Sequence, residues 1–379
     1  MSARMCGPSP TASSRSGSSA SATTGPSTRS TRVRNGPRVL SSRTIPPSSC
    51  ASAWATSTPS ARTAAATSTL RITAGAPDAW TRSSCRPPSS WVPSPTLAAD
   101  KLRVVTSITD LKALTEAVGG DLVEVDSLAR STQNAHDLEA RPSLMIKVRR
   151  ADAIVLNGLD LDDWADVVAQ GANNPNVIVG APGRIDASRG LLVLEVPRSR
   201  IDRSMGDVHP AGNPHYTLDP GLAAQVTQNI LEGLARLAPQ NRATFERNRQ
   251  QFLARLEEAM GRWNKLLEPY KGAPVVVNHN MWLYFLTRFG LVQAGSIEER
   301  PGIPPTPSHL VKLVNQMKQE RIKVIVVEPW GDLKTVQRVA QEAGAQAAVL
   351  ASSVGALKGT DSYINWVDSN VKMLAQALK

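Results

Sequence analysis

From residue 101 onward, the chain alternates between short apolar runs and longer segments of mixed polarity. The apolar runs predict buried strands, and the mixed segments, whose apolar residues recur every three or four positions, predict amphipathic helices. In the first half we expect strands at 102–107, 122–125, 153–156 and 176–179, and helices at 108–118, at 142–150 and from 160 onward. Apolar strands that alternate with helices are typical of βα units around a parallel sheet.

The longest periodic segment spans residues 239–269. Its apolar residues recur at spacings of three and four over about seven turns, Pro239 can occupy the first turn, and Pro269 ends the helix. A helix of ~30 residues would be ~45 Å long, which is too long for a crossover within a small lobe. A coiled coil is the alternative, but a single copy between two α/β regions favours a spine helix that packs against both.

After this segment the alternation of strands and helices resumes. We expect strands at 275–277, 291–295, 324–327 and 347–350, and helices at 282–289, 308–320, 333–343 and 363–378. The pattern predicts the α/β class, with an N-terminal lobe at 100–238, a linking helix at 239–269 and a C-terminal lobe at 270–379.

The net charge of +11 suggests an anionic partner until its distribution is considered. Residues 1–99 contain eleven arginines and one acid, whereas 32 basic and 31 acidic residues lie in 100–379. The folded region is therefore nearly neutral, and we expect no nucleic-acid partner. All three cysteines (Cys6, Cys50 and Cys85) also precede residue 100, so the folded region offers imidazole and oxygen, but no thiolate, to a metal.

Residues 1–99 are rich in Ser, Thr, Ala, Pro and Arg, and they lack Phe, Tyr, Lys and Glu. Such a composition predicts a disordered tail. We interpret it as the product of a misassigned start or reading frame, with a basic arm as the alternative. Residues 95–100 resemble the small-residue end of a secretory signal, although the apolar region that should precede it is missing. No apolar run of 18 residues is present, so no membrane span is expected.

Three histidines lie in loops between predicted elements. His136 lies within Asn134-Ala135-His136-Asp137, His215 within the stretch 212–220, and His279 directly after the strand at 275–277. Ligands of such sheets gather beyond the carboxyl ends of the strands. Histidines on three separate loops, drawn from both halves, indicate a metal site assembled in a shared cleft.

These motifs and their order resemble the metal-binding receptors of ABC importers, the ZnuA/TroA-like cluster A-I family of zinc- and manganese-binding solute-binding proteins. The resemblance covers about residues 101–379. It rests on His136 with Arg141-Pro142-Ser143, on Asn157-Gly158 before Trp164, on the stretch 212–220, and on His279 with Trp282 and Tyr284-Phe285. It implies two pseudo-symmetric α/β lobes with parallel sheets, joined by one long rigid helix.

The resemblance also implies that His136, His215 and His279 are the metal ligands. The usual fourth ligand of the family, an aspartate after the last strand, aligns here with Ser353, which is a poor ligand. We therefore expect Glu298, which ends a strand on the cleft side, to be the fourth ligand. Glu328, Asp361 and water are the alternatives.

The chain departs from the family in two further places. It lacks the histidine-rich loop that is common in zinc-binding members, and Thr217 replaces a frequent tryptophan. Of the two remaining histidines, we expect His209 to lie at the rim of the site or behind the ligands, and His309 to be a surface or capping residue.

The resemblance implies a monomeric, periplasmic or otherwise extracytoplasmic receptor that delivers metal to the membrane subunit of an ABC importer. Three imidazoles with at most one carboxylate favour Zn²⁺ over Mn²⁺. The chain has no phosphate-binding Gly-rich loop, so it is not the ATPase partner. One alternative is a zinc-dependent hydrolase with Glu298 or Asp219 as general base, although no His-Glu-x-x-His motif is present. A second alternative is a metal-chelate binder with basic cleft walls.

Overall fold

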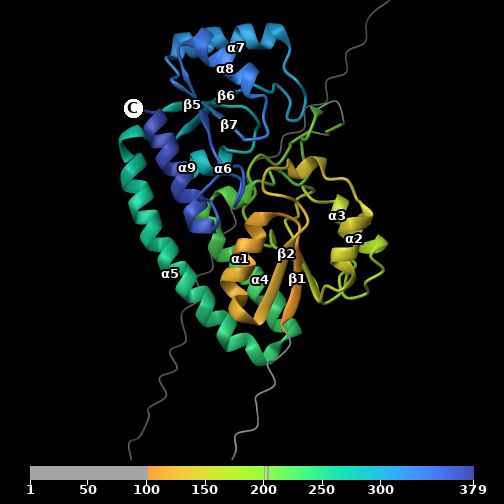
Figure 1. Ribbon diagram of the computed structural model, residues 1–379. Helices are drawn as coiled ribbons and strands as arrows, with labels where there is room; N and C mark the ends of the chain where they lie inside the picture. Colours follow the sequence, from red (N-terminus) through yellow and green to blue (C-terminus); the bar gives the residue numbers. More distant parts are fainter. Residues whose placement is uncertain (1–100, 200, 203–204) are drawn as a thin grey trace, which may run out of the picture. The chain divides into compact units, whose positions relative to one another are not determined.

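The computed structural model describes residues 101–199, 201–202 and 205–379, which all belong to the compact unit Pro88–Lys379. The predictions of a disordered tail, a misassigned start and a signal remnant in residues 1–99 lie outside the described residues. The described part forms two α/β lobes alongside a long helix, α5 (Arg242–Leu267) (Figure 1).

The N-terminal lobe is built on a four-stranded parallel sheet in the order β2-β1-β3-β4. Every residue of β3 is buried, because helices cover both faces of the sheet. The strands are β1 (Leu102–Thr106), β2 (Val123–Ser127), β3 (Ala153–Leu156) and β4 (Arg184–Asp186). The helices are α1 (Thr109–Gly119), α2 (Pro142–Arg149), α3 (Trp164–Gly171) and α4 (Ala223–Leu237).

The prediction of a strand at 176–179 is wrong, and the fourth strand of the sheet is β4. Residues 176–179 form turns, in which Asn174 Oδ1 accepts a hydrogen bond from the Asn176 amide at 3.0 Å. Val177 is buried, but Ile178 and Val179 are exposed. The local hydrogen-bonding of asparagine side chains outweighs the strand preference of three apolar residues.

The C-terminal lobe repeats the arrangement with a parallel sheet in the order β6-β5-β7-β8. The strand order of one sheet therefore matches that of the other, which makes the lobes pseudo-symmetric. The strands are β5 (Pro274–Val277), β6 (Val292–Ser296), β7 (Val324–Val327) and β8 (Gln346–Val349). The helices are α6 (Leu283–Arg288), α7 (Pro307–Glu320), α8 (Leu333–Ala343) and α9 (Tyr363–Ala377).

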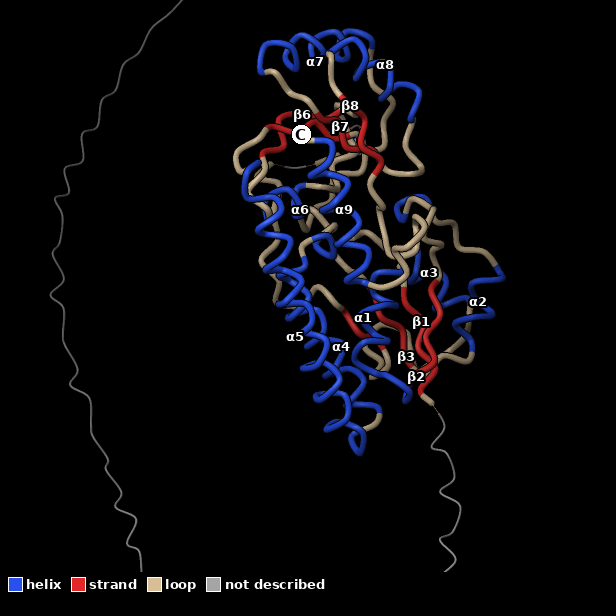
Figure 2. The backbone as a smooth tube through the Cα atoms, turned by 60° about the vertical axis from the view of Figure 1, so that its left-hand side comes forward, coloured by secondary structure: helices blue, strands red, loops and turns tan. Residues whose placement is uncertain are grey.

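Helix α5 runs along both lobes, as the spine predicted from the sequence (Figure 2). Its 26 residues give a length of about 39 Å, and short 3₁₀ turns at Pro239–Asn241 and Glu268–Tyr270 extend it at both ends. Phe252 and Trp263 of its apolar stripe are buried, whereas Leu266 is 41% exposed and the adjacent Leu267 is buried in its place. The preceding helix α4 was not predicted from the sequence, although its apolar residues are also spaced three and four apart.

The two lobes share one hydrophobic core. It runs from the N-terminal sheet through α5 and α9 to the second sheet, and a smaller core lies beneath α7 and α8. The carboxylate of buried Asp110 also joins the lobes, because it accepts hydrogen bonds from the Thr217 hydroxyl and from the Val354 amide, both at 2.9 Å. Helix α5, the shared core and the hydrogen bonds of Asp110 together hold the loops of the two lobes against one another.

Candidate metal centre

His136 lies in a single 3₁₀ turn, Ala135–Asp137, in the loop that follows β2. Asn134 caps this turn, since its Oδ1 accepts a hydrogen bond from the His136 amide at 3.2 Å. Trp164, from the start of α3, donates its indole N–H to the Ala135 carbonyl at 2.9 Å. The turn is thus fastened both to itself and to a neighbouring helix.

His215 lies in the stretch 212–220, which follows β4 through a long connection. Asn213 Oδ1 accepts a hydrogen bond from the His215 amide at 3.0 Å, and Asn157 Nδ2 donates to the Pro214 carbonyl at 3.1 Å. From the other lobe, the Tyr284 hydroxyl donates to the Asn213 carbonyl at 3.1 Å. Both lobes therefore hold the main chain on which His215 is mounted.

His279 follows β5 directly and is 98% shielded from solvent. Its Nδ1 lies 2.8 Å from Glu298 Oε2, at the end of β6. A ring nitrogen that donates to a carboxylate leaves Nε2 with the free lone pair, which is the arrangement of a metal-binding histidine. Glu298 Oε2 also accepts a hydrogen bond from the Gly302 amide at 2.7 Å, which anchors the carboxylate.

The structure brings the three predicted histidines together. One ligand nitrogen from each of His136, His215 and His279 lies within 4.8 Å of the other two. The Nε2 atoms of His136 and His215 are 3.3 Å apart, and the three ring centroids are separated by 5.2–5.7 Å. Two ligands of a tetrahedral zinc ion, at bond lengths of about 2.0–2.1 Å, lie about 3.3–3.4 Å apart.

The three rings differ in how readily they take up a proton, because only His279 lies beside a carboxylate. Desolvation, together with the neighbouring imidazoles, lowers the pKa of His136 and of His215 well below the ordinary value. Desolvation also opposes protonation of His279, but the hydrogen bond and charge of Glu298, aided by Glu328 and Asp207, outweigh it and raise the pKa of His279. Two of the rings are therefore held neutral, in the form that binds metal.

Glu298 is in contact with the site, but through His279. It is not a member of the three-histidine group, and its carboxylate holds the Nδ1 side of that ring. Its predicted role as fourth ligand is therefore untested by the geometry, which places it as the hydrogen-bond acceptor that orients His279.

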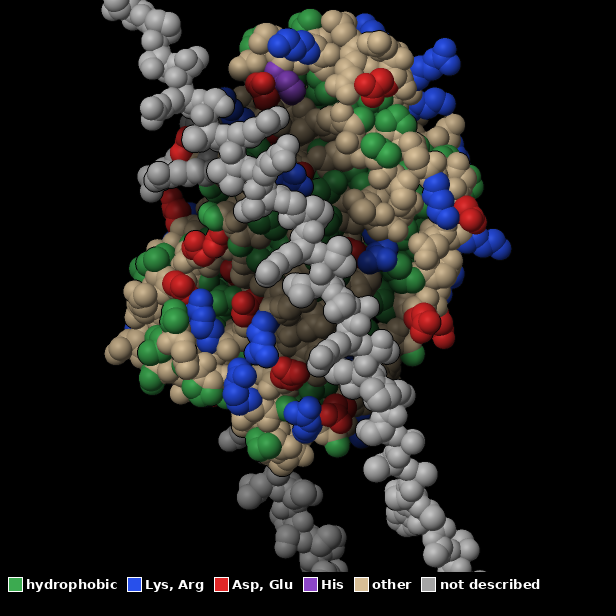
Figure 3. All heavy atoms as spheres, turned by 180° about the vertical axis from the view of Figure 1, so that it is seen from behind, with side chains coloured by type: hydrophobic (Ala, Val, Ile, Leu, Met, Phe, Trp, Pro, Cys, Tyr) green, Lys and Arg blue, Asp and Glu red, His purple; other side chains and the backbone are tan. Residues whose placement is uncertain are grey.

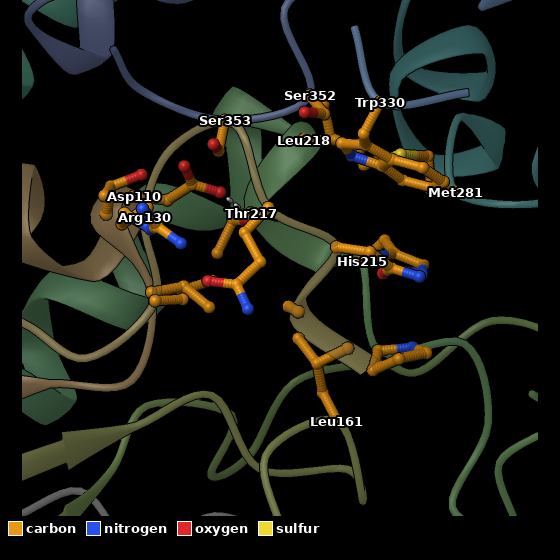
Figure 4. Close-up of a pocket in the computed structure, with 17 residues that line it drawn as sticks. Asp110, Arg130, Leu161, His215, Thr217, Leu218, Met281, Trp330, Ser352 and Ser353 are labelled. Atoms are coloured by element: carbon orange, nitrogen blue, oxygen red, sulfur yellow. Dashed lines mark hydrogen bonds between the residues drawn. The ribbon is translucent and has the colours of Figure 1, made fainter. Parts of the chain in front are cut away.

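The two carboxylates considered as alternatives to Glu298 make hydrogen bonds elsewhere. Buried Glu328 accepts hydrogen bonds from Asn278 Nδ2 and Trp282 Nε1. Exposed Asp361 accepts from Asn365 Nδ2 and lines a surface cavity between α1, α5 and α9. Ser353 lines a small cavity beside His215 (Figure 4), but its hydroxyl donates to the Ser131 carbonyl at 2.8 Å.

His209 lies beside the ligands and lines the cavity at the site. Its ring centroid is 5.0 Å from that of His136, and the planes are inclined by 31°. His209 lies six residues before His215, and that spacing alone does not show that the two rings meet the same cluster. His309, in contrast, begins α7, where its amide is capped by Thr306 and its Nε2 lies 2.9 Å from the Ser296 carbonyl.

A cavity of about 300 Å³ opens beside the histidines. Its walls include His209, His215 and His279, with Asp207 and Glu195 as the charged residues, and none of the described residues that line it is Lys or Arg. On the face of the molecule shown in Figure 3, acidic and basic side chains are interspersed rather than gathered by sign. The acidic character is therefore confined to the lining of the cavity, which suits a cation.

The fold and the site together define a two-lobed α/β metal receptor with a helical linker. A sequence profile described as ZnuA, the periplasmic component A of a zinc-uptake complex, matches residues 104–377. The chain belongs to this family, whose members are metal receptors of ABC importers and not enzymes. The hydrolase alternative is thereby set aside. Asp219, its proposed general base, accepts hydrogen bonds from the Arg288 guanidinium at both carboxylate oxygens.

Individual relatives agree with this assignment. The high-affinity zinc uptake system protein ZnuA of Bacillus subtilis (strain 168) is 25% identical over 286 residues, which cover 74% of this chain and 88% of the relative. A crystal structure of ZnuA is 27% identical, with a TM-score of 0.63, covering 74% of this chain and all of the other. A zinc-bound ZnuA lacking residues 138–173 is 26% identical, with a TM-score of 0.62, covering 73% and 98%. Among the described helices, none is both long and apolar enough to cross a membrane.

Proposed function

We propose that this chain binds one zinc ion between its lobes through His136, His215 and His279, and delivers it to the membrane subunit of an ABC importer. The observation that carries the proposal is the convergence of three imidazole nitrogens from both lobes within 4.8 Å. The three nitrogens come from three separate loops. The separation of 3.3 Å between the Nε2 atoms of His136 and His215 suits a tetrahedral zinc site.

The donor set supports zinc over manganese. Neutral imidazole suits zinc, whereas manganese prefers carboxylate, carbonyl and water oxygens. The three-histidine group contains no carboxylate. Glu298, the acid that contacts His279, accepts hydrogen bonds from the His279 ring and from the Gly302 amide.

The walls of the cavity support a bare or hydrated cation as the cargo. The chelate binder considered as an alternative would carry its metal with an anionic ligand and would need basic walls. Asp207 and Glu195 line the cavity instead, and they would repel such a ligand. We propose in addition that the receptor works outside the cytoplasm, since the matching family is described as the periplasmic component of a zinc-uptake complex, and that it does so as a monomer.

Metal analysis and calorimetry test this function. Protein purified without chelators is expected to contain one zinc per chain, and zinc is expected to bind the metal-free protein more tightly than manganese does. Tighter manganese binding would overturn the choice of metal, and absence of binding by either ion would overturn the receptor function. Light scattering with and without zinc tests the monomer, because a dimer in either state would contradict it.

A further inference from the structure

His209 carries an imidazole nitrogen that is buried and without a partner. Its Nε2 has an exposed area below 1 Å² and makes no hydrogen bond within the part of the chain that the structure describes. The ring lies 5.0 Å from that of His136, as close as any pair of rings in the cluster. A buried polar atom without a partner is uncommon in proteins, and a neutral imidazole nitrogen in this state has a lone pair available to a metal ion.

The other nitrogen of His209 is already used. The main chain of Asp160 lies near the ring and favours its protonation, although burial lowers the pKa of His209 overall. With Nε2 unpartnered, a proton on Nδ1 directed at this main chain leaves the lone pair on Nε2. Metal-binding histidines are held in the same way, with one N–H donated to a carbonyl or carboxylate. His279 shows the corresponding arrangement with Glu298.

The loop that carries His209 is connected to the loop that orients His279. The Asp207 amide donates to the Pro301 carbonyl at 2.8 Å, and the adjacent Gly302 amide donates to Glu298. Gly206 has φ +79°, and a Cβ there would lie 2.1 Å from the Pro301 oxygen. Only glycine permits this close approach, by which the His209 loop contacts the C-terminal lobe.

We propose that His209 Nε2 is the fourth ligand of the metal, which makes the site a four-imidazole site. This inference rests on the proposed function. The fourth nitrogen is not among the three that lie within 4.8 Å of one another, so coordination by all four imidazoles requires the His209 side chain to turn towards the ion. Ser353, at the position of the family's aspartate, donates its hydroxyl to Ser131 and leaves this coordination place open.

The test compares His209→Asn with His309→Asn in the full-length chain. Asparagine at 209 retains a donor near the position of Nδ1 for Asp160 but lacks the ligand nitrogen. Removing a residue that merely orients a ligand lowers metal affinity about 10–100-fold, so loss of a ligand is expected to exceed about 100-fold. Competition with a chelating dye measures the affinity, and His309→Asn is expected to equal the wild type.

X-ray absorption of the zinc-loaded protein counts the imidazoles directly. We expect four in the wild type and three in His209→Asn. Three imidazoles in the wild type, or a loss of affinity in His209→Asn of less than about 100-fold, would overturn the proposal. Asp207 is the rival for the fourth position, and a larger loss in Asp207→Asn than in His209→Asn would also overturn it.

Failure of this inference is distinguishable from failure of the proposed function. If His136→Asn and His279→Asn abolish zinc binding while His209→Asn does not, only the fourth ligand is wrong. If the wild type itself does not bind zinc, the receptor function is wrong. The wild-type imidazole count stands even if the variant at 209 fails to fold.

Discussion

At the scale of single residues, each imidazole of the cluster depends on a neighbour that orients it. Asn134 and Asn213 accept hydrogen bonds from the amides of His136 and His215, and Glu298 accepts one from the ring of His279. The ligand loops are therefore ordered before metal arrives. Such preorganisation lowers the entropy that binding has to overcome.

The first prediction concerns the three histidines. His136→Ala, His215→Ala and His279→Ala are each expected to weaken zinc binding by more than about 100-fold, because a direct ligand contributes more than the residues that orient it. The melting temperature of the metal-free protein is expected to change little in His136→Ala and His215→Ala, whose rings are only partly buried, and to fall in His279→Ala, which loses a buried ring and its hydrogen bond to Glu298. Calorimetry and thermal melts measure both, with His309→Ala as the control. Unchanged affinity in any of the three would break the three-histidine site.

The second prediction concerns the charge of Glu298. Glu298 raises the pKa of His279, so protons compete with zinc for that ring as the pH falls towards 6.5, whereas His136 and His215 stay neutral to lower pH. Glu298→Gln keeps a hydrogen-bond acceptor but lowers the pKa of His279. Zinc affinity at pH 8 is expected to fall about 10–100-fold, and the further loss between pH 8 and 6 to be smaller than in the wild type.

Zinc titrations at several pH values provide this measurement. A pH profile identical to that of the wild type would exclude the electrostatic role of Glu298. A loss at pH 8 much beyond 100-fold would show instead that Glu298 is itself a ligand, as the sequence led us to expect.

At the scale of elements, α5 is held by a few large side chains. Trp263 is 99% shielded from solvent and donates its indole N–H to Asp368 of α9 at 3.1 Å. Phe252 lies against Tyr363, with ring centroids 6.0 Å apart. These contacts join the linking helix to α9, and both helices belong to the continuous core.

The third prediction tests this packing. Trp263→Ala is expected to lower the free energy of unfolding by about 3–5 kcal/mol, because it removes a large buried side chain and leaves a cavity. Leu266→Ala on the same helix is the control, since Leu266 is 41% exposed and surface changes stay within about 0.5 kcal/mol. Denaturant unfolding of the metal-free protein measures both. Equal effects of the two substitutions would contradict the role of α5 as a packed spine.

At the scale of the whole molecule, the last helix of the chain returns to the first lobe. Helix α9 packs against α5, and its Tyr363 hydroxyl donates to the Thr217 carbonyl at 2.7 Å, two residues from His215. The domain boundaries proposed from the sequence place α9 with the C-terminal lobe. Its contacts show that it also supports the loop that carries a ligand of the N-terminal lobe.

The fourth prediction concerns residues 1–99. The positive charge of the chain is concentrated there, and residues 100–379 are nearly neutral, so we expect protein that begins at Asp100 to melt and bind zinc as the full chain does. Thermal melts and calorimetry of both forms check this. A large fall in melting temperature or zinc affinity would show that these residues belong to the folded receptor.

The sequence by itself determined the α/β class, the long helix and the loops of His136, His215 and His279. These features depend on local periodicity and turn-forming residues, which the sequence carries directly. It mispredicted the strand at 176–179, because three apolar residues cannot be distinguished from a half-buried turn by pattern alone.

Only the tertiary structure decided which side chains meet. Glu298 lies behind His279 because β5 and β6 pair in parallel, and His209 reaches the cluster because its loop bonds Pro301 in the other lobe. Neither contact can be predicted from a periodic pattern in the sequence, since each depends on packing between segments that are far apart in sequence. Local sequence patterns were therefore enough to identify the loops that carry the histidines, whereas the arrangement of the side chains around the site depends on the fold.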